Sequence, residues 1–169
     1  MSASKIKNID NFIIRFGRSV SWINFILIVV IILQVVLRYG FGKGLVVLEE
    51  LQWHLYAAGV MIGLSYSQSA DSHIRVDVFH MRFSRNSKNF WEIFGIVFFL
   101  IPFILVVFFN SLPFVAEAWR LNEMSDAPTG LPWRWLIKSV IPVSMLLLLA
   151  SALSRLLREL ASFFGLNED

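Results

Sequence analysis

The chain has 169 residues, of which 57% are hydrophobic and 16% are charged, and its mean hydropathy is +0.67. Soluble domains carry nearer to about 25% charged residues, so this composition argues against a soluble domain and favours a membrane protein. The formal charge is +3, but the basic residues do not form a patch interleaved with aromatic residues, so nucleic acid is not expected as a partner. The sequence contains no cysteine, which excludes disulfides and thiolate metal sites.

Residues 5–18 predict an amphipathic helix that lies flat on the membrane surface; a frayed tail is the alternative. Its apolar side chains recur at helical spacing, and they are Ile6, Ile9, Phe12, Ile13 and Phe16. The apolar run that follows ends at Arg38 and Tyr39 rather than at a small-residue cleavage site. We therefore expect a retained membrane span and not a signal peptide.

Four apolar stretches are long enough to cross a bilayer, namely Ser19–Leu37, Leu45–Tyr66, Ile93–Leu112 and Leu136–Leu156. An α-helix rises about 1.5 Å per residue, so roughly 20 residues cover the ~30 Å hydrocarbon layer. Because backbone groups in lipid must be paired within their own segment, these stretches should be helices. We predict an all-α, polytopic membrane protein whose residues 1–169 form a single four-helix membrane domain.

The distribution of basic residues predicts the orientation. Ten of the 15 Lys and Arg lie in the N-terminal segment, the second loop and the C-terminal segment, and five lie in the other two loops. Cytoplasmic loops carry the excess of Lys and Arg, so both termini are expected in the cytoplasm.

The second apolar stretch carries a stripe of polar and small residues. At 100° per residue, its members fall within about 80° of one another. They are Glu49, Gln52, Tyr56, Gly59, Gly63 and Ser67. Two glycines four residues apart let another backbone approach closely, so we expect this stripe to pack within the chain or against a partner subunit.

Glu49 and Glu50 are the acidic residues of the four predicted spans, and both lie near a helix end. They could be solvated at the outer surface, or form an outer charge cluster with Arg38 or with a neighbouring polypeptide. A third interpretation, ion-coupling carboxylates, is disfavoured because such groups usually lie near the midplane of the membrane.

The two longer loops differ in character. The second loop, residues 68–92, holds an inner cluster that could end the preceding helix or bind lipid headgroups or a partner loop; its members are Asp71, His73, Arg75 and Asp77. The third span should bend at Pro102. In the third loop, residues 113–135, we predict a short helix along the membrane interface, where tryptophan is favoured, and then a turn at Pro128, Gly130 and Pro132.

The sequence predicts no catalytic, metal or cofactor site. It contains no Gly-x-Ser-x-Gly turn, and the spacing of its three histidines is not that of metal ligands. His54 is interpreted as an interfacial residue, and His73 and His80 as loop residues.

Four segments stand out by their order and spacing, namely residues 37–41, 49–51, 73–78 and 139–143, with the glycine pair 59 and 63 between the second and third. This succession resembles the small membrane subunit of tripartite ATP-independent periplasmic (TRAP) transporters. The four predicted spans and the chain length fit the same family. The resemblance covers nearly the whole chain.

The resemblance implies a non-catalytic accessory subunit in the bacterial inner membrane that contributes to sodium-coupled symport of organic acids, such as sialic acid or dicarboxylates. Its implied partners are a large membrane subunit of about a dozen spans, which moves by an elevator-like mechanism, a periplasmic substrate-binding protein, and membrane lipids. The small subunit would brace the large one. The outer loop is the candidate docking surface for the periplasmic protein, through Trp119, Arg120, Glu123 and Trp133.

Two other functions compete with this hypothesis. A self-sufficient oligomeric channel or small exporter would give flux when this chain alone is reconstituted. A membrane redox subunit that holds haem between helices is disfavoured by the scarcity of histidine within the spans, and an absorption spectrum would test it.

Overall fold

The computed structural model describes residues 3–70 and 85–164, and the regular elements in these ranges are all helices. In chain order they are α1 (Ala3–Val20), α2 (Trp22–Val35), the π-helical turn η1 (Val36–Gly40), α3 (Val46–Ser69), α5 (Arg85–Gly95), the π-helical turn η2 (Ile96–Leu100), α6 (Ile101–Arg120) and α7 (Arg134–Phe163). The all-helical prediction is confirmed for this part of the chain.

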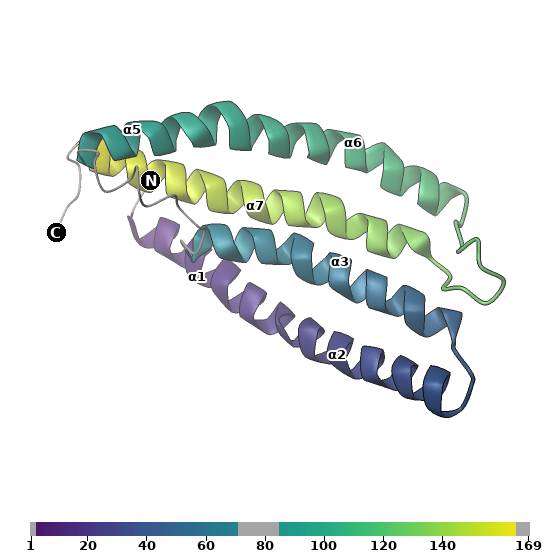
Figure 1. The fold of residues 1–169 in the computed structure, drawn as a ribbon. Coiled ribbons are helices and arrows are strands. Elements are labelled where there is room, and N and C mark those ends of the chain that lie inside the picture. The colour runs from purple at the N-terminus through teal and green to yellow at the C-terminus, as the bar shows by residue number, and fades with distance from the viewer. Residues whose placement is uncertain (1–2, 71–84, 165–169) are drawn as a thin grey trace.

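The long helices lie side by side in a row in the order α2, α3, α7 and α6 (Figure 1). Helix α7 packs against both α6 and α3, and α3 packs in turn against α2. We call the end of the row where α1 begins and α7 finishes the terminal end, and the other the hairpin end. The hairpin end holds the turn between α2 and α3 and the loop of residues 121–133, called the α6–α7 loop below (Figure 1).

Three continuous helical runs are long and apolar enough to cross a membrane, by length and composition: Asp10–Gly40, Ser87–Arg120 and Arg134–Phe163. The sequence predicts a fourth span at Leu45–Tyr66, and the structure has α3 at this place. Helix α3 is not among the three, because polar side chains crowd its first half. The count of four spans stays a prediction. Helix α3 lies between α2 and α7, so polar groups on these two sides of α3 meet protein instead of lipid.

The N-terminal helix is present, but it does not stand apart from the bundle. Helix α1 packs along α3 and α7, and it leads into α2 across a single residue (Figure 1). Ile13 is buried against these neighbours, whereas Phe12 and Phe16 are exposed and stack on each other with their ring centroids 6.2 Å apart. Its amphipathic pattern therefore serves two surfaces, because one side meets protein and the aromatic side faces outward.

The third span is one long helical run with a wide turn in its middle. The π-helical turn η2 ends just before Pro102, which lacks an N–H and would otherwise crowd the carbonyl of Phe98 one turn back. The run continues through Pro113 to Arg120. The separate interfacial helix predicted for residues 113–135 is therefore wrong, since its first part extends α6 and residues 121–133 are non-helical. A single proline removes only one backbone hydrogen bond, which the flanking turns tolerate.

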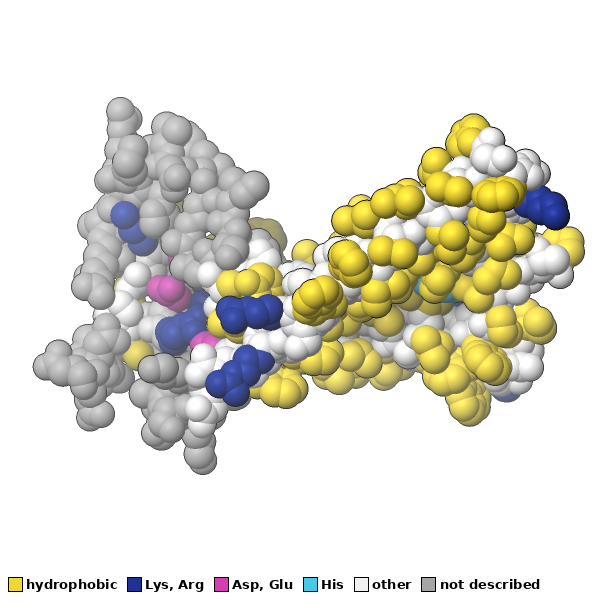
Figure 2. Space-filling model, turned by 90° about the horizontal axis from the view of Figure 1, so that it is seen from below, with side chains coloured by type: hydrophobic (Ala, Val, Ile, Leu, Met, Phe, Trp, Pro, Cys, Tyr) yellow, Lys and Arg dark blue, Asp and Glu magenta, His cyan; other side chains and the backbone are white. Residues whose placement is uncertain are grey.

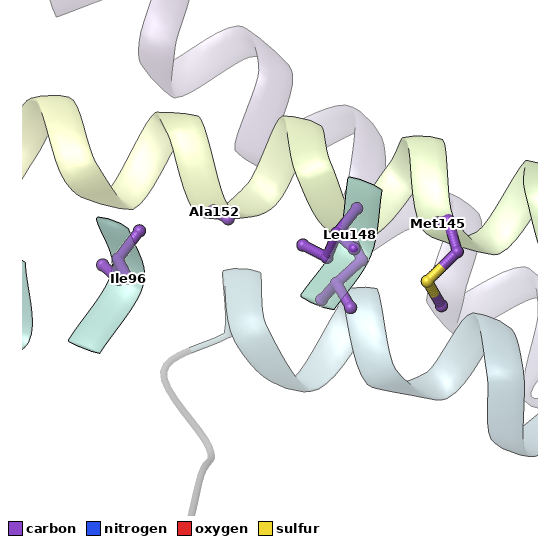
Figure 3. Close-up of a cluster of buried hydrophobic side chains, with 5 residues drawn as sticks. Ile96, Met145, Leu148 and Ala152 are labelled. Atoms are coloured by element: carbon purple, nitrogen blue, oxygen red, sulfur yellow. The ribbon is translucent and has the colours of Figure 1, made fainter. Parts of the chain in front are cut away.

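The core is small and lies between α7 and the third span. Its fully buried residues are Ile96, Ile104, Met145, Leu148 and Ala152 (Figure 3). Most other large apolar side chains are exposed, and on the face seen in Figure 2 they cover much of the surface away from the terminal end. In water such a surface would be unstable, so this distribution suits hydrocarbon or a partner protein.

Candidate functional site

The turn between α2 and α3 is held by a polar group of three side chains. Arg38 lies 2.7 Å from the carboxylate of Glu49, and the Gln34 side-chain amide donates to the same carboxylate at 3.2 Å. The Gln34 carbonyl accepts from the backbone N–H of Leu45 at 3.2 Å. Gly42 has a φ of +64°, which permits the chain to reverse between these helices. Gln34 is buried, and its side chain donates one hydrogen bond to Glu49 and accepts one from Leu45, so it ties the end of α2 to the start of α3.

Glu50 does not join Arg38. Its carboxylate instead accepts a short hydrogen bond from the Ser125 hydroxyl and a 2.6 Å bond from the backbone N–H of Leu131, both in the α6–α7 loop. Gly130 completes this cradle, because a Cβ there would lie 2.3 Å from the Cβ of Ser125 and 2.8 Å from Glu50. Adjacent helical residues point about 100° apart, so Glu49 and Glu50 meet different neighbours.

A second carboxylate orders the other side of the α6–α7 loop. Glu123 forms a short ion pair with Lys138 and lies 3.6 Å from Arg134, whose guanidinium is also 3.6 Å from Asp126. The ammonium of Lys138 lies 3.9 Å from the ring centre of Phe114, within cation–π range. These contacts fix the loop to the start of α7 and the end of α6.

The predicted docking residues divide into two groups. Trp119 and Trp133 are exposed at 63% and 61%, and Arg120 is exposed and paired with Glu117 at 2.7 Å. Glu123 is committed to the internal pairs described above. Trp133 has a φ of +61°, a left-handed conformation that is costly for a large side chain, and it immediately precedes α7. Trp119 at the end of α6 and Trp133 in the α6–α7 loop, rather than Glu123, are thus the groups exposed at this end.

The stripe on α3 also divides. A Cβ at Gly59 would lie 3.2 Å from the side-chain oxygen of Asn24, so this glycine faces α2 inside the chain. A Cβ at Gly63 would meet no atom within 4 Å, and Tyr56 is 56% exposed. Gln52 is half-buried. One part of the stripe therefore serves internal packing, and another part is open.

A model of the family described as "Tripartite ATP-independent periplasmic transporters, DctQ component" matches residues 27–162. The chain belongs to the DctQ family. No curated protein in the comparison matches it. Membership makes it a small membrane component of a TRAP transporter and a multi-pass membrane protein, and it implies association with the other TRAP components.

Within this DctQ chain, the strongest polar contacts at the terminal end were missed by sequence reasoning. Asp10 of α1 accepts from the hydroxyl of Ser154 at 2.8 Å and forms a short ion pair with Arg158. One turn away, Arg155 lies 3.0 Å from Glu92 of α5. The signal that could have revealed them is periodic, because buried residues of α7 recur every three or four positions: Ser144, Leu148, Ser151 and Arg155.

Serine contacts join the last turns of α3 to α7. The hydroxyls of Ser69 and Ser151 lie 2.7 Å apart, and Ser151 also donates to the carbonyl of Ser65 at 3.1 Å. Small hydroxyl side chains allow close backbone approach and bond across the interface, a common way for helices to associate in membranes. Ser65 and Ser69 lie close to the last residue of the stripe predicted from the sequence, in which Gly59 and Gly63 were expected to make the close contacts.

The remaining predicted groups are less informative. The inner cluster of Asp71, His73, Arg75 and Asp77 lies outside the described residues, as does His80. His54 borders a groove of about 640 Å³ together with Glu50, Trp53 and Arg134. In the described ranges, no three His, Cys, Asp or Glu side chains gather as metal ligands would.

Proposed function

We propose that this DctQ chain is the non-catalytic bracing subunit of a sodium-coupled TRAP importer of organic acids, of the sialic acid or dicarboxylate type. Its family membership supports the role of a small membrane component. Sodium coupling and the substrate class follow from the resemblance of the sequence. In this proposal the chain lies in the bacterial inner membrane with both termini in the cytoplasm, as the distribution of Lys and Arg predicts.

The observation that carries this proposal is that α7 is tied to its neighbours at both ends. At the terminal end Asp10 joins α1 to Arg158, and at the hairpin end Glu123 joins the α6–α7 loop to Lys138. Glu50 joins the same loop to α3. A row of helices fastened at both ends resists sliding and tilting. This is what a fixed frame requires when a partner subunit moves beside it.

The shape of the row adds a second line of support. Helices arranged in a row present two broad sides (Figure 1), and exposed apolar side chains such as those on the face in Figure 2 are suited to lipid or to a membrane partner. The open part of the α3 stripe, with Gly63 and Tyr56, is our candidate contact with the large subunit. Close backbone approach at a bare glycine favours helix association in lipid.

We further propose that the hairpin end docks the periplasmic substrate-binding protein. Trp119 at the end of α6 and Trp133 in the α6–α7 loop are exposed there, and Glu50 and Glu123 hold this loop in place. Exposed aromatic side chains on a preorganised surface are common anchors of protein interfaces, because they bury a large area at a small cost in entropy.

The test is uptake of a radiolabelled organic acid into proteoliposomes under an inward sodium gradient. Vesicles that hold this chain with its large subunit should accumulate substrate when the binding protein and sodium are both supplied. Vesicles that hold this chain alone should accumulate none. Uptake by the chain alone would refute the bracing role and favour an autonomous channel or exporter.

A variant pair tests docking separately. Trp119→Ala combined with Trp133→Ala should raise the concentration of binding protein needed for half-maximal uptake, while the maximal rate is kept. Trp91→Ala is the matched control, because Trp91 is also exposed, at 55%, but lies on α5 toward the terminal end. An equal response of both variants would argue against docking at the α6–α7 loop.

A further inference from the structure

Two arginines on α1 stand out because, among the described residues, no carboxylate pairs with either. Arg15 and Arg18 are exposed and lie one helical turn apart on the same side of α1. With Ser19 and Trp22 they line an open hollow of about 440 Å³. The neighbouring arginines of α7 differ, since Arg155 and Arg158 pair with Glu92 and Asp10. Within residues 3–70 and 85–164, the charge of this hollow is therefore not neutralised by a carboxylate.

The position of the hollow along the helix indicates its surroundings. Arg18 and Arg38 lie 20 residues apart in one continuous helical run. At about 1.5 Å per residue this separation is roughly 30 Å, the thickness of the hydrocarbon layer. Between them, α2 is apolar and largely exposed. Arg38 has Glu49 as its partner, whereas Arg18 lies at the level of the lipid headgroups of the opposite leaflet.

The side chains beside the arginines are suited to a lipid. Trp22 is 68% exposed and Phe25 is 58% exposed, and the two rings meet edge to face with centroids 5.8 Å apart. Tryptophan is favoured at the boundary between headgroups and acyl chains. Figure 2 shows Lys and Arg side chains gathered where the apolar surface of this face gives way to the terminal end. A charged site next to exposed aromatic rings matches a ligand with an anionic head and an apolar tail.

We propose that Arg15 and Arg18 bind the phosphate of an anionic phospholipid in the leaflet at the terminal end, with an acyl chain against Trp22 and Phe25. A guanidinium presents paired N–H donors that match phosphate oxygens, and both arginines can reach one headgroup from adjacent turns. The bound lipid anchors the start of the first span to the bilayer. This inference concerns the isolated chain and holds whether or not the bracing role is correct.

The test is native mass spectrometry of the delipidated full chain, titrated with phosphatidylglycerol or with phosphatidylcholine of the same acyl chains. The wild-type chain should bind phosphatidylglycerol more tightly. Arg15→Gln with Arg18→Gln should lose this preference, with an affinity drop of about thirtyfold from two membrane-facing charges. Arg15→Lys with Arg18→Lys should keep most of it. Arg120→Gln, which removes an exposed charge at the hairpin end, should bind as the wild type does.

Several results would overturn the proposal. They are equal binding of the two lipids by the wild type, an unchanged affinity in the double glutamine variant, and complete displacement of the lipid by millimolar inorganic phosphate, which would indicate a simple anion site. A double glutamine variant that keeps its lipid but loses the large subunit would show that the arginines contact an acidic protein segment. Circular dichroism melting checks folding, and if the double glutamine variant unfolds, the single variants Arg15→Gln and Arg18→Gln decide the question, since each should lose part of the preference for phosphatidylglycerol.

Discussion

Gly17→Ala should destabilise the chain by separating α1 from α3. A Cβ at residue 17 would lie 2.7 Å from the Cβ of Tyr66, whereas ordinary contacts begin at 3.4 Å, so the helices must move apart by about 0.7 Å. No rotamer change relieves this contact, because the Cβ of Tyr66 is fixed to its backbone. Such overpacking costs about 1–3 kcal/mol. Against this, replacing glycine by alanine in a helix contributes about 1 kcal/mol of stability.

Gly95→Ala is the matched control, because a Cβ at residue 95 meets no atom within 4 Å. Both variants gain helix propensity, so their difference in unfolding free energy isolates the contact with Tyr66 and should be about 1–3 kcal/mol. The assay is reversible unfolding in mixed detergent micelles, followed by helical circular dichroism. Equal stability of the two variants would show that α1 does not pack on α3 at this point.

Three further predictions follow from the polar and glycine contacts. Asp10→Ala should lower the unfolding free energy by about 2 kcal/mol, because Ser154 and Arg158 of α7 lose their hydrogen-bond acceptor. The control Ser19→Ala removes only an exposed hydrogen bond within α1 and should leave the unfolding curve unchanged. Glu50→Ala should speed hydrogen exchange at the backbone amide of Leu131, and Glu50→Gln should do so less, since an amide oxygen still accepts. Gly63→Leu should leave the stability of the isolated chain unchanged yet prevent co-purification with the large subunit; an intact complex would place the partner elsewhere.

The positions of the helices could be predicted from the sequence because apolar runs of this length can pair their backbone groups in lipid only by forming helices. The expected spans at Ser19–Leu37, Ile93–Leu112 and Leu136–Leu156 each fall within a longer helical run. Their true ends were not predicted, because helix ends depend on contacts rather than on hydrophobicity. Helix α7 extends to Phe163 since its polar last turns meet α1 and α5.

The partners of the charged residues were harder to predict. Arg38 and Glu49 lie 11 residues apart across a short turn, so their approach follows from local geometry. Asp10 and Arg158 are separated by 148 residues, and nothing local selects one partner over the other basic residues. The pair forms only because α1 packs against α7. The amphipathic pattern of α1 is compatible with this packing but does not by itself predict it. The sequence favoured a membrane surface instead.

Glu50 shows how one residue connects two hairpins that the sequence presents as separate. It lies near the start of α3, and its carboxylate accepts hydrogen bonds from the loop between α6 and α7, while its neighbour Glu49 pairs with Arg38 at the end of the first span. These contacts of Glu49 and Glu50 all start from the first five residues of α3, so the hairpin end is ordered as a unit. A displacement of α2 would be transmitted through α3 to the α6–α7 loop, and with it to Trp119 and Trp133. A surface proposed to receive a soluble protein is therefore fixed by the same helices that are proposed to hold the membrane partner.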